Sequence, residues 1–192
     1  MPSFEQVILK TARLVLRPLA AADAPTLLAI FSDPVIMRYW SSPPWASIDE
    51  AHAMVARDQK AMATGEYLRF GVVQAGTDRL IGTCTLFSIN TACRRAEVGY
   101  SLAQSAWGQG YMHEALRALL EYGFTEMQLN RVEADIDPRN TASARSLDRL
   151  GFTREGFLRE RWIVNGEVSD TALYGLLQRE WFAAQTDSRG ET

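Results

Sequence analysis

The sequence predicts an α+β fold: a mixed, mostly antiparallel central sheet of about seven strands, covered by about four helices. Two observations predict it. Short runs of strand-like apolar residues occur near both ends of the chain, which is typical of an antiparallel sheet. Between residues 96 and 136, a strand-like run, a glycine loop, an amphipathic helix and a second strand-like run follow one another. Because a helix crosses between these two strands, we expect them to be parallel.

The N-terminal part is predicted to hold one strand and two helices, at residues 14–17, 20–31 and 48–62. Ser47 and Glu50 have the spacing of a capping box, which predicts that the second helix starts there. Between the two helices lies an aromatic, proline-containing loop at residues 39–45.

The other strands are predicted at residues 69–74, 80–87, 96–102, 131–136, 161–164 and 168–177. The last two flank Asn165-Gly166, a strong hairpin turn. Helices are predicted from Met112 to Phe124, and from Asn140 to Leu150. We expect a single domain at residues 1–182, followed by a polar, frayed tail at residues 183–192.

The composition is that of an ordinary globular protein, with 47% hydrophobic and 22% charged residues among 192. A net charge of −3 gives no nucleic-acid footprint, and no apolar run approaches the length of a membrane span. Two cysteines and two histidines form neither a disulfide framework nor a metal motif, so we expect no metal. We also expect a cytoplasmic protein, without nucleic-acid or membrane partners, that is a monomer or a homodimer.

The most informative segment is the glycine loop at residues 107–110, which opens directly into the helix that begins near Tyr111. A glycine turn leading into a helix N-terminus directs free backbone N–H groups at one point, where an anion such as a phosphate binds well. No Lys-Ser or Lys-Thr pair follows the glycines, which excludes a P-loop. No G-x-G-x-x-G motif is present either.

Three further patterns accompany the loop: E-A-L at residues 114–116, D-P-x-N-x-x-S at residues 137–143 and L-G-F-x-x-E-G at residues 150–156. Together with W-G-x-G-Y at residues 107–111, they resemble the GNAT superfamily of N-acetyltransferases, and most closely its RimJ/RimL-type branch. That branch includes enzymes that acetylate the N-terminal amine of ribosomal proteins. The resemblance covers residues 14–181.

The resemblance implies acetyl-CoA as co-substrate, bound where the parallel strands splay apart. The residues that it implies for cofactor binding are Ser101, Leu102, Ala103, Trp107, Gly108, Gln109, Gly110, Tyr111, Met112, Asn140 and Ser143. Main-chain groups of residues 101–103 are expected to bind the pantetheine arm and polarise the thioester carbonyl. Trp107 stands where many relatives have a glutamine or arginine, so the pyrophosphate is expected to depend on N–H groups and Gln109.

Ser143 shares a helix face with Leu147 and Leu150, so its hydroxyl points inward and needs a partner. One candidate is a backbone carbonyl one turn back, and the other is the CoA sulfur, to which Ser143 would donate a proton. The tyrosine that many GNAT enzymes use for this purpose is replaced by Leu147. Asn140 has two possible roles as well, a helix N-cap and a contact with the pantetheine arm.

The acceptor amine must be neutral to react, and Glu97 is the best candidate for the base. The alternative for Glu97 is an ion pair with Arg94 or Arg95 on an exposed strand face. Glu133, Asp135 and Glu160 are weaker candidates for the base.

Aromatic residues of the 39–45 loop, Tyr39, Trp40 and Trp45, are expected to line the acceptor pocket together with the Asn165-Gly166 hairpin. Neither Cys84 nor Cys93 lies in a nucleophile motif, which favours direct transfer. The predicted function is therefore acetyl transfer to a primary amine, such as a protein N-terminus. The alternatives are a GNAT enzyme acting on a small-molecule amine, and a CoA-binding regulatory or structural module without transfer activity.

Overall fold

The computed structural model describes residues 3–187, which form one eight-stranded sheet with the order β1-β2-β3-β4-β5-β6-β8-β7. The strands are β1 (Leu9–Lys10), β2 (Leu14–Pro18), β3 (Leu68–Gln74), β4 (Arg79–Asn90), β5 (Arg95–Leu102), β6 (Arg131–Ile136), β7 (Thr153–Val164) and β8 (Glu167–Leu177). All neighbouring strands are antiparallel except β5 and β6, which are parallel. The predicted mixed sheet and its one parallel pair are confirmed.

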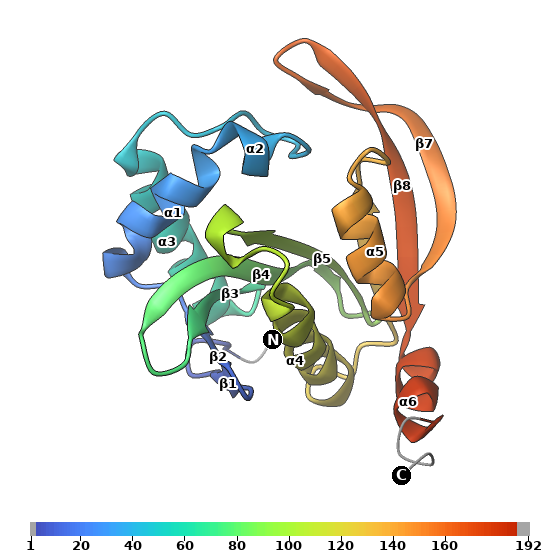
Figure 1. The fold of residues 1–192 in the computed structure, drawn as a ribbon. Helices are drawn as coiled ribbons and strands as arrows, with labels where there is room; N and C mark the ends of the chain where they lie inside the picture. The colour runs from blue at the N-terminus through green and yellow to red at the C-terminus, as the bar shows by residue number, and fades with distance from the viewer. Residues whose placement is uncertain (1–2, 188–192) are drawn as a thin grey trace.

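The described residues also form six α-helices, α1 (Ala24–Phe31), α2 (Pro34–Met37), α3 (Ile48–Thr64), α4 (Tyr111–Thr125), α5 (Thr141–Arg149) and α6 (Gln178–Asp187). Figure 1 shows α1, α2 and α3 gathered at one end of the molecule, and the β7–β8 hairpin rising beside α5 at the other. The sheet connects these two ends, so its middle strands lie between them.

The parallel strands β5 and β6 pair along only part of their length. Their register runs from Arg95 opposite Arg131 to Glu97 opposite Glu133, and it stops there. β5 continues to Leu102 and stays paired with β4, while β6 continues to Ile136 and stays paired with β8. The two strands therefore splay apart beyond Glu97, as the family resemblance implied.

Two hydrophobic clusters hold the ends of the sheet in place. The larger one packs α4 against the sheet through residues such as Leu116, Leu119 and Phe124. The smaller one packs α1 against α3 through Leu27, Phe31 and other apolar residues. Each cluster fixes its own helices. The glycine loop before α4 and the loop between α1 and α3 are therefore held next to the place where β5 and β6 diverge.

Several predicted boundaries need correction. The expected tail is helical up to Asp187, because α6 packs Trp181 on Phe124 with ring centroids 5.9 Å apart; residues 188–192 lie outside the described part of the chain. β7 starts at Thr153, eight residues before the predicted strand. Its residues are almost all exposed, so burial does not impose a clear apolar alternation. The short elements β1 and α2 were also missed.

Two local predictions are confirmed in detail. The Glu50 carboxylate accepts hydrogen bonds from the N–H groups of Ala46 and Ser47, at 2.7 and 3.1 Å, which caps the start of α3. Asn165 and Gly166 both have positive φ, 50° and 83°, and connect Val164 directly to its partner Glu167. Positive φ at both central residues is the geometry of a tight hairpin turn.

Candidate active site

The glycine loop has the geometry expected of an anion site. Gly108 and Gly110 have φ values of 72° and 77°, which L side chains rarely adopt. A Cβ added at Gly108 would meet no atom within 4 Å, so the space outside the loop is open. Gly110 is the N-cap of α4 and has no side-chain cap. Within the described residues, no acceptor takes the N–H groups of Tyr111, Met112 or His113, which leaves them available to an anion.

The polar side chains of the loop hold the loop itself. The Trp107 indole N–H donates to the carbonyl of Leu102 at 2.7 Å, which ties the loop to the end of β5. Gln109 Nε2 donates to the carbonyl of Ser105 at 2.9 Å, so its side chain is occupied as well. The Tyr111 hydroxyl accepts from Gln74 on β3 at 3.0 Å. The cofactor role predicted for these residues therefore rests on their backbone.

A guanidinium lies at this loop, although it does not come from the motif. Arg13, from the turn between β1 and β2, donates to the carbonyl of Gln109 at 3.0 Å and to Glu114 at 2.7 Å. Its Nη2 would lie 3.5 Å from a Cβ built at Gly110. Nearly one hundred residues separate Arg13 from the loop, so motif spacing gave no signal for this contact.

The end of β5 offers fewer main-chain groups than predicted. The Ala103 N–H donates to Ile81 at 2.8 Å and its carbonyl accepts from Ala106 at 2.9 Å, so neither group is available to a cofactor. Backbone direction alternates along an antiparallel ladder, so Ser101 faces β4 too. Tyr100 and Leu102 instead direct their backbone groups toward the splayed side, where the Leu102 carbonyl accepts from the Trp107 indole N–H. The N–H groups of Tyr100 and Leu102 therefore face the space between the two strands.

On the opposite side of the splay, Asn140 and Ser143 start α5. Asn140 Oδ1 accepts from the Ser143 N–H at 3.1 Å, which confirms the predicted N-cap. The Ser143 side chain is buried on the inward face with Leu147, also as predicted. Its hydroxyl does not bond a carbonyl one turn back: Ser143 Oγ lies 2.6 Å from Tyr100 Oη. Tyr100 was missed by the sequence analysis, since nothing in a strand-like run marks one tyrosine as a partner of a helix serine.

The four candidate carboxylates are in different environments. Glu133 is bound by Arg95 at 2.7 Å and by Arg131 at 2.8 Å. Asp135 accepts from Thr171 at 2.8 Å and lies 3.9 Å from Arg161. Glu160 is exposed on β7. Glu97 has no hydrogen-bond or ion-pair partner among the described residues, so the predicted alternative of a pair with Arg94 or Arg95 is not found.

A cavity of about 340 Å³ lies where β5 and β6 diverge. Its walls come from both ends of the molecule and from the sheet between them, and its main lining residues are Phe31, Tyr39, Trp40, Arg69, Phe87, Glu97, Tyr100, Asp135, Asn140, Ser143, Arg161 and Trp162. Tyr39 and Trp40 both line this cavity. Trp45 is not among the lining residues, because it stacks on Phe31 with ring centroids 4.6 Å apart.

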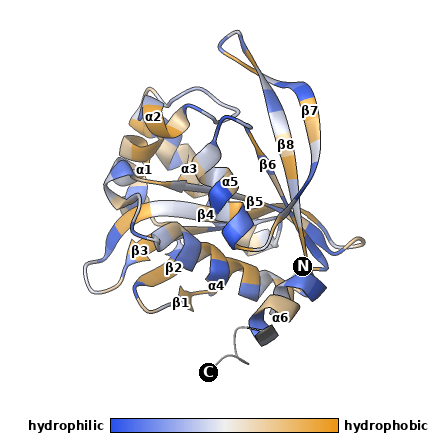
Figure 2. Ribbon diagram, turned by 45° about the vertical axis from the view of Figure 1, so that its right-hand side comes forward, coloured by the Kyte–Doolittle hydropathy of each residue, from blue (hydrophilic) through white to orange (hydrophobic). Residues whose placement is uncertain are grey.

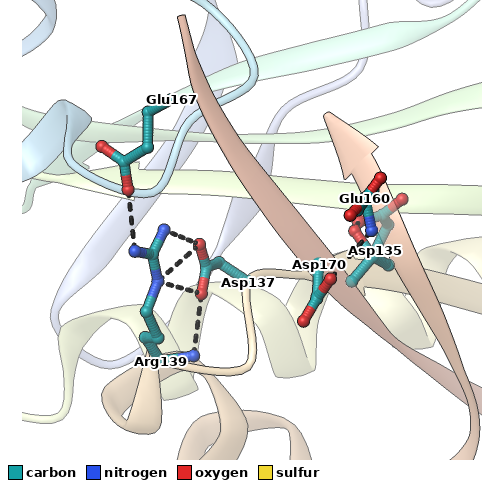
Figure 3. Close-up of polar contacts among 7 residues, drawn as sticks. Asp135, Asp137, Arg139, Glu160, Glu167 and Asp170 are labelled. Carbon is teal, nitrogen blue, oxygen red and sulfur yellow. Dashed lines mark hydrogen bonds and ion pairs between the residues drawn. The ribbon is translucent and has the colours of Figure 1, made fainter. Parts of the chain in front are cut away.

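One salt-bridge network anchors the hairpin wall of this cavity. Arg139 Nη2 donates to Asp137 at 2.7 Å, and Arg139 Nη1 donates to Glu167 at 2.7 Å. Figure 3 shows the guanidinium between the two carboxylates. Burial by itself would raise the pKa of Asp137, but the hydrogen bonds and the charge of Arg139 outweigh it and hold that pKa below its usual value. The D-P-R-N segment therefore supports the hairpin as well as α5.

The residues present fit acetyl-CoA. The open glycine loop and the free N–H groups at the start of α4 suit its pyrophosphate, and the unpaired edge of β5 suits the amides of its pantetheine arm. In the described part of the chain, no group of three or more His, Cys, Asp or Glu could hold a metal ion. No helix in residues 3–187 is long and apolar enough to span a membrane.

Comparison with known proteins agrees with this site. The chain matches the family described as an acetyltransferase (GNAT) domain over residues 13–153. It is 37% identical over 173 residues to the uncharacterized N-acetyltransferase p20 of Bacillus licheniformis, covering 90% of this chain and 97% of p20. It is 28% identical to the [ribosomal protein uS5]-alanine N-acetyltransferase of Escherichia coli K12, covering 92% of this chain and 93% of that enzyme.

Among solved structures, the spermidine N-acetyltransferase of Vibrio cholerae in complex with CoA and spermine matches with a TM-score of 0.80 and 27% identity, covering 90% of this chain and 99% of that one. The chain therefore belongs to the GNAT acetyltransferase family. It is an acyltransferase that uses acetyl-CoA, which decides between an enzyme and a CoA-binding module in favour of the enzyme.

Proposed function

We propose that this enzyme acetylates the N-terminal α-amine of a peptide or protein by direct transfer, with Glu97 as the base and Ser143 as the acid. The observation that carries the proposal is the state of Glu97. Two of the candidate carboxylates, Glu97 and Asp135, line the cavity, and of these two Glu97 has no hydrogen-bond or ion-pair partner among the described residues. A carboxylate in that state can accept a proton from an amine, directly or through one water.

The pKa of the acceptor amine decides how much assistance it needs from a base. An α-amino group has a pKa near 8, whereas a lysine-type amine has a pKa near 10.4. An α-amine is therefore already partly neutral near pH 7, and a single carboxylate can remove its remaining proton. A lysine-type amine would need a much stronger push, and the other nearby carboxylates are engaged with Thr171, Arg139 or other arginines.

The aromatic walls of the cavity also favour an acceptor with one amine. Phe31, Tyr39, Trp40 and Trp162 line it. Arg69, which lines it too, is fixed by hydrogen bonds from Nε to Thr85 at 2.9 Å and from Nη1 to Asp58 at 3.3 Å. These walls suit an apolar side chain next to a single amine better than they suit a polyamine, which carries several positive charges.

The transfer balances with the groups at the site. The amine nitrogen bonds to the acetyl carbon, the carbon–sulfur bond breaks and the sulfur keeps its electron pair. Glu97 takes the proton that the amine loses and releases it to solvent, and Ser143 gives a proton to the sulfur and is then reprotonated. The Leu102 N–H points to the splayed side, where it can polarise the acetyl oxygen.

An acceptor panel tests the proposal. The purified enzyme is given acetyl-CoA with one of four acceptors, and CoA thiol release and acetyl gain by mass spectrometry are followed. The acceptors are a short peptide with free N-terminal alanine, the same peptide N-terminally blocked but carrying lysine, spermidine, and an aryl-alkyl monoamine. We expect the free N-terminus to have the highest kcat/KM. A preference for spermidine or for the blocked lysine peptide would refute the α-amine assignment.

A small-molecule monoamine is the second candidate, and the size of the cavity favours it. A volume of about 340 Å³ is near the lower end for ligand pockets and holds one or two residues of a peptide. A higher kcat/KM for the aryl-alkyl monoamine than for the peptide would select this candidate.

A further inference from the structure

Tyr100 and Ser143 come from opposite sides of the splay and meet through their hydroxyls. Tyr100 lies on β5, Ser143 lies on the first turn of α5, and their oxygens are 2.6 Å apart. Both side chains line the cavity. Among the described residues neither hydroxyl has another hydrogen-bond partner.

The two hydroxyls carry two protons but share one hydrogen bond, so one proton is left to point elsewhere. A phenol is a stronger acid than an aliphatic alcohol, and an alcohol oxygen is the better acceptor, which favours Tyr100 as the donor. Burial raises the pKa of Tyr100 to about 12, against the opposing effect of the hydrogen bond to Ser143, so the phenol keeps its proton near neutral pH. The Ser143 proton is then the free one, and the cavity is the space in front of it.

We propose that Tyr100 is a positioning residue that holds the Ser143 oxygen as an acceptor and thereby directs the Ser143 proton at the leaving sulfur of acetyl-CoA. This inference rests on the proposed role of Ser143 as the acid. When the carbon–sulfur bond breaks, Ser143 Oγ gives its proton to the sulfur and takes the shared proton from Tyr100. A proton from solvent then returns to the Tyr100 oxygen, so both hydroxyls regain their protons after the turnover.

Three variants test the pair: Tyr100→Phe, Ser143→Ala and the double variant. A general acid contributes about 10²–10⁴-fold, and the CoA thiol is a tolerable leaving group, so Ser143→Ala is expected near the low end in kcat. Tyr100→Phe should lower kcat by about tenfold while the KM for acetyl-CoA changes less than about twofold, since only the transition state loses an interaction. The double variant should be no slower than Ser143→Ala, because Tyr100 acts through Ser143.

Tyr122→Phe is the matched control. Tyr122 is a half-buried tyrosine on α4 that packs against the larger hydrophobic cluster and does not line the cavity. Its variant should keep kcat, which separates the proposed role from a general effect of removing a tyrosine hydroxyl. Ser143→Thr keeps a hydroxyl for Tyr100 and should retain more activity than Ser143→Ala.

The outcomes distinguish this inference from the proposed function. Each variant is also assayed by CoA release from acetyl-CoA in water alone, which has the same leaving group and needs no acceptor. An unsuccessful acceptor panel would therefore refute the α-amine proposal and leave the Tyr100 test intact. A normal kcat in Tyr100→Phe, or losses that multiply in the double variant, would overturn the role of Tyr100. A normal kcat in Ser143→Ala would overturn both roles at once.

Discussion

The cofactor side and the acceptor side of the splay are built in different ways. The cofactor side is local: residues 107–112 supply the glycines, the helix start and the N–H groups in one short segment. The acceptor side is assembled from segments far apart in the sequence, including Trp40, Arg69, Glu97 and Trp162. The cofactor side offers mainly backbone groups, and the acceptor side offers mainly side chains. The first side can therefore serve any acceptor, whereas we propose that the second side selects it.

The largest expected effect lies on the acceptor side. Glu97→Gln removes the base and should lower kcat/KM near pH 7 by about 10²–10⁴-fold. The deficit should shrink above about pH 8, where an α-amine loses its proton without assistance. Steady-state rates measured from pH 6 to pH 9.5 would show this.

Glu133→Gln is the matched control for the Glu97 variant. It makes the same chemical change on the neighbouring strand β6, directly opposite Glu97, at a carboxylate that is held by Arg95 and Arg131 and does not line the cavity. We expect a loss of stability without the pH-dependent rate defect. Equal rate defects in the two variants would mean that Glu97 has only a structural role.

The next effect tests the cofactor side. Gly110→Val forces a β-branched residue into φ of 77° and places methyl groups where the anion approaches. Strain of this kind costs about 1–3 kcal/mol of stability. Because the methyl groups block the anion, we expect CoA affinity to fall by roughly tenfold to a hundredfold in a calorimetric titration.

Gly76→Val is the matched control, because it introduces similar backbone strain at a position outside the candidate site. Gly76 has a similar φ of 81° and open space around its Cα, but lies in the turn between β3 and β4. It should lower the melting temperature about as much as Gly110→Val while CoA affinity is unchanged. Unchanged CoA affinity in a folded Gly110→Val variant would remove the assignment of this loop as the pyrophosphate site.

These two sides also differ in how much the sequence could predict. The glycine loop, the Asn140 cap and the inward face of Ser143 follow from local geometry, and the structure confirms each of them. Ala103 could not be excluded from sequence, because its N–H is taken by Ile81 through the strand pairing. Tyr100 and Arg13 were missed for the same reason: each acts through a partner more than forty residues away. Local patterns fix backbone geometry, whereas pairings between distant side chains need the fold.

A smaller effect separates two tryptophans that the sequence treated alike. Trp40 and Trp45 both contact Phe31, with ring centroids 5.3 and 4.6 Å apart, but only Trp40 lines the cavity. Trp40→Ala should raise the KM for the acceptor by about threefold to tenfold, since a contact of about 0.6–1.4 kcal/mol corresponds to that range. Trp45→Ala should lower the melting temperature and leave that KM near its wild-type value. An increased acceptor KM in both variants would extend the acceptor site to Trp45.

The smallest effect concerns the link between the two sides. Arg139, next to the cofactor-side residue Asn140, bonds Glu167 at the base of the hairpin turn, and the hairpin carries Trp162 into the cavity (Figure 3). Glu167 is 64% exposed and Arg139 is 50% exposed, so water and salt screen the pair. Exposed pairs contribute about 0.2–1 kcal/mol. In a protein of this size that corresponds to at most about 4 °C in the melting temperature of Glu167→Gln.

Asp137, the other carboxylate bound by Arg139, should contribute more to stability than Glu167. The Asp137 side chain is 6% exposed and accepts from both the guanidinium and the backbone N–H of Arg139. Asp137→Asn should therefore cost more stability than Glu167→Gln, about 1–3 kcal/mol for hydrogen bonds lost to a charged group. Because the pKa of Asp137 is held below its usual value, its contribution is present above about pH 4 and is lost as the pH falls through the folded-state pKa. Melting temperatures between pH 3 and pH 7 should converge for wild type and Asp137→Asn at the acid end.

If Glu167→Gln were instead the more damaging change, the hairpin would depend on its exposed ion pair, and the cavity wall that carries Trp162 would be held mainly from the acceptor side. The apolar bands along the exposed strand β7 (Figure 2) give that wall little burial of its own, so we expect the buried carboxylate to dominate.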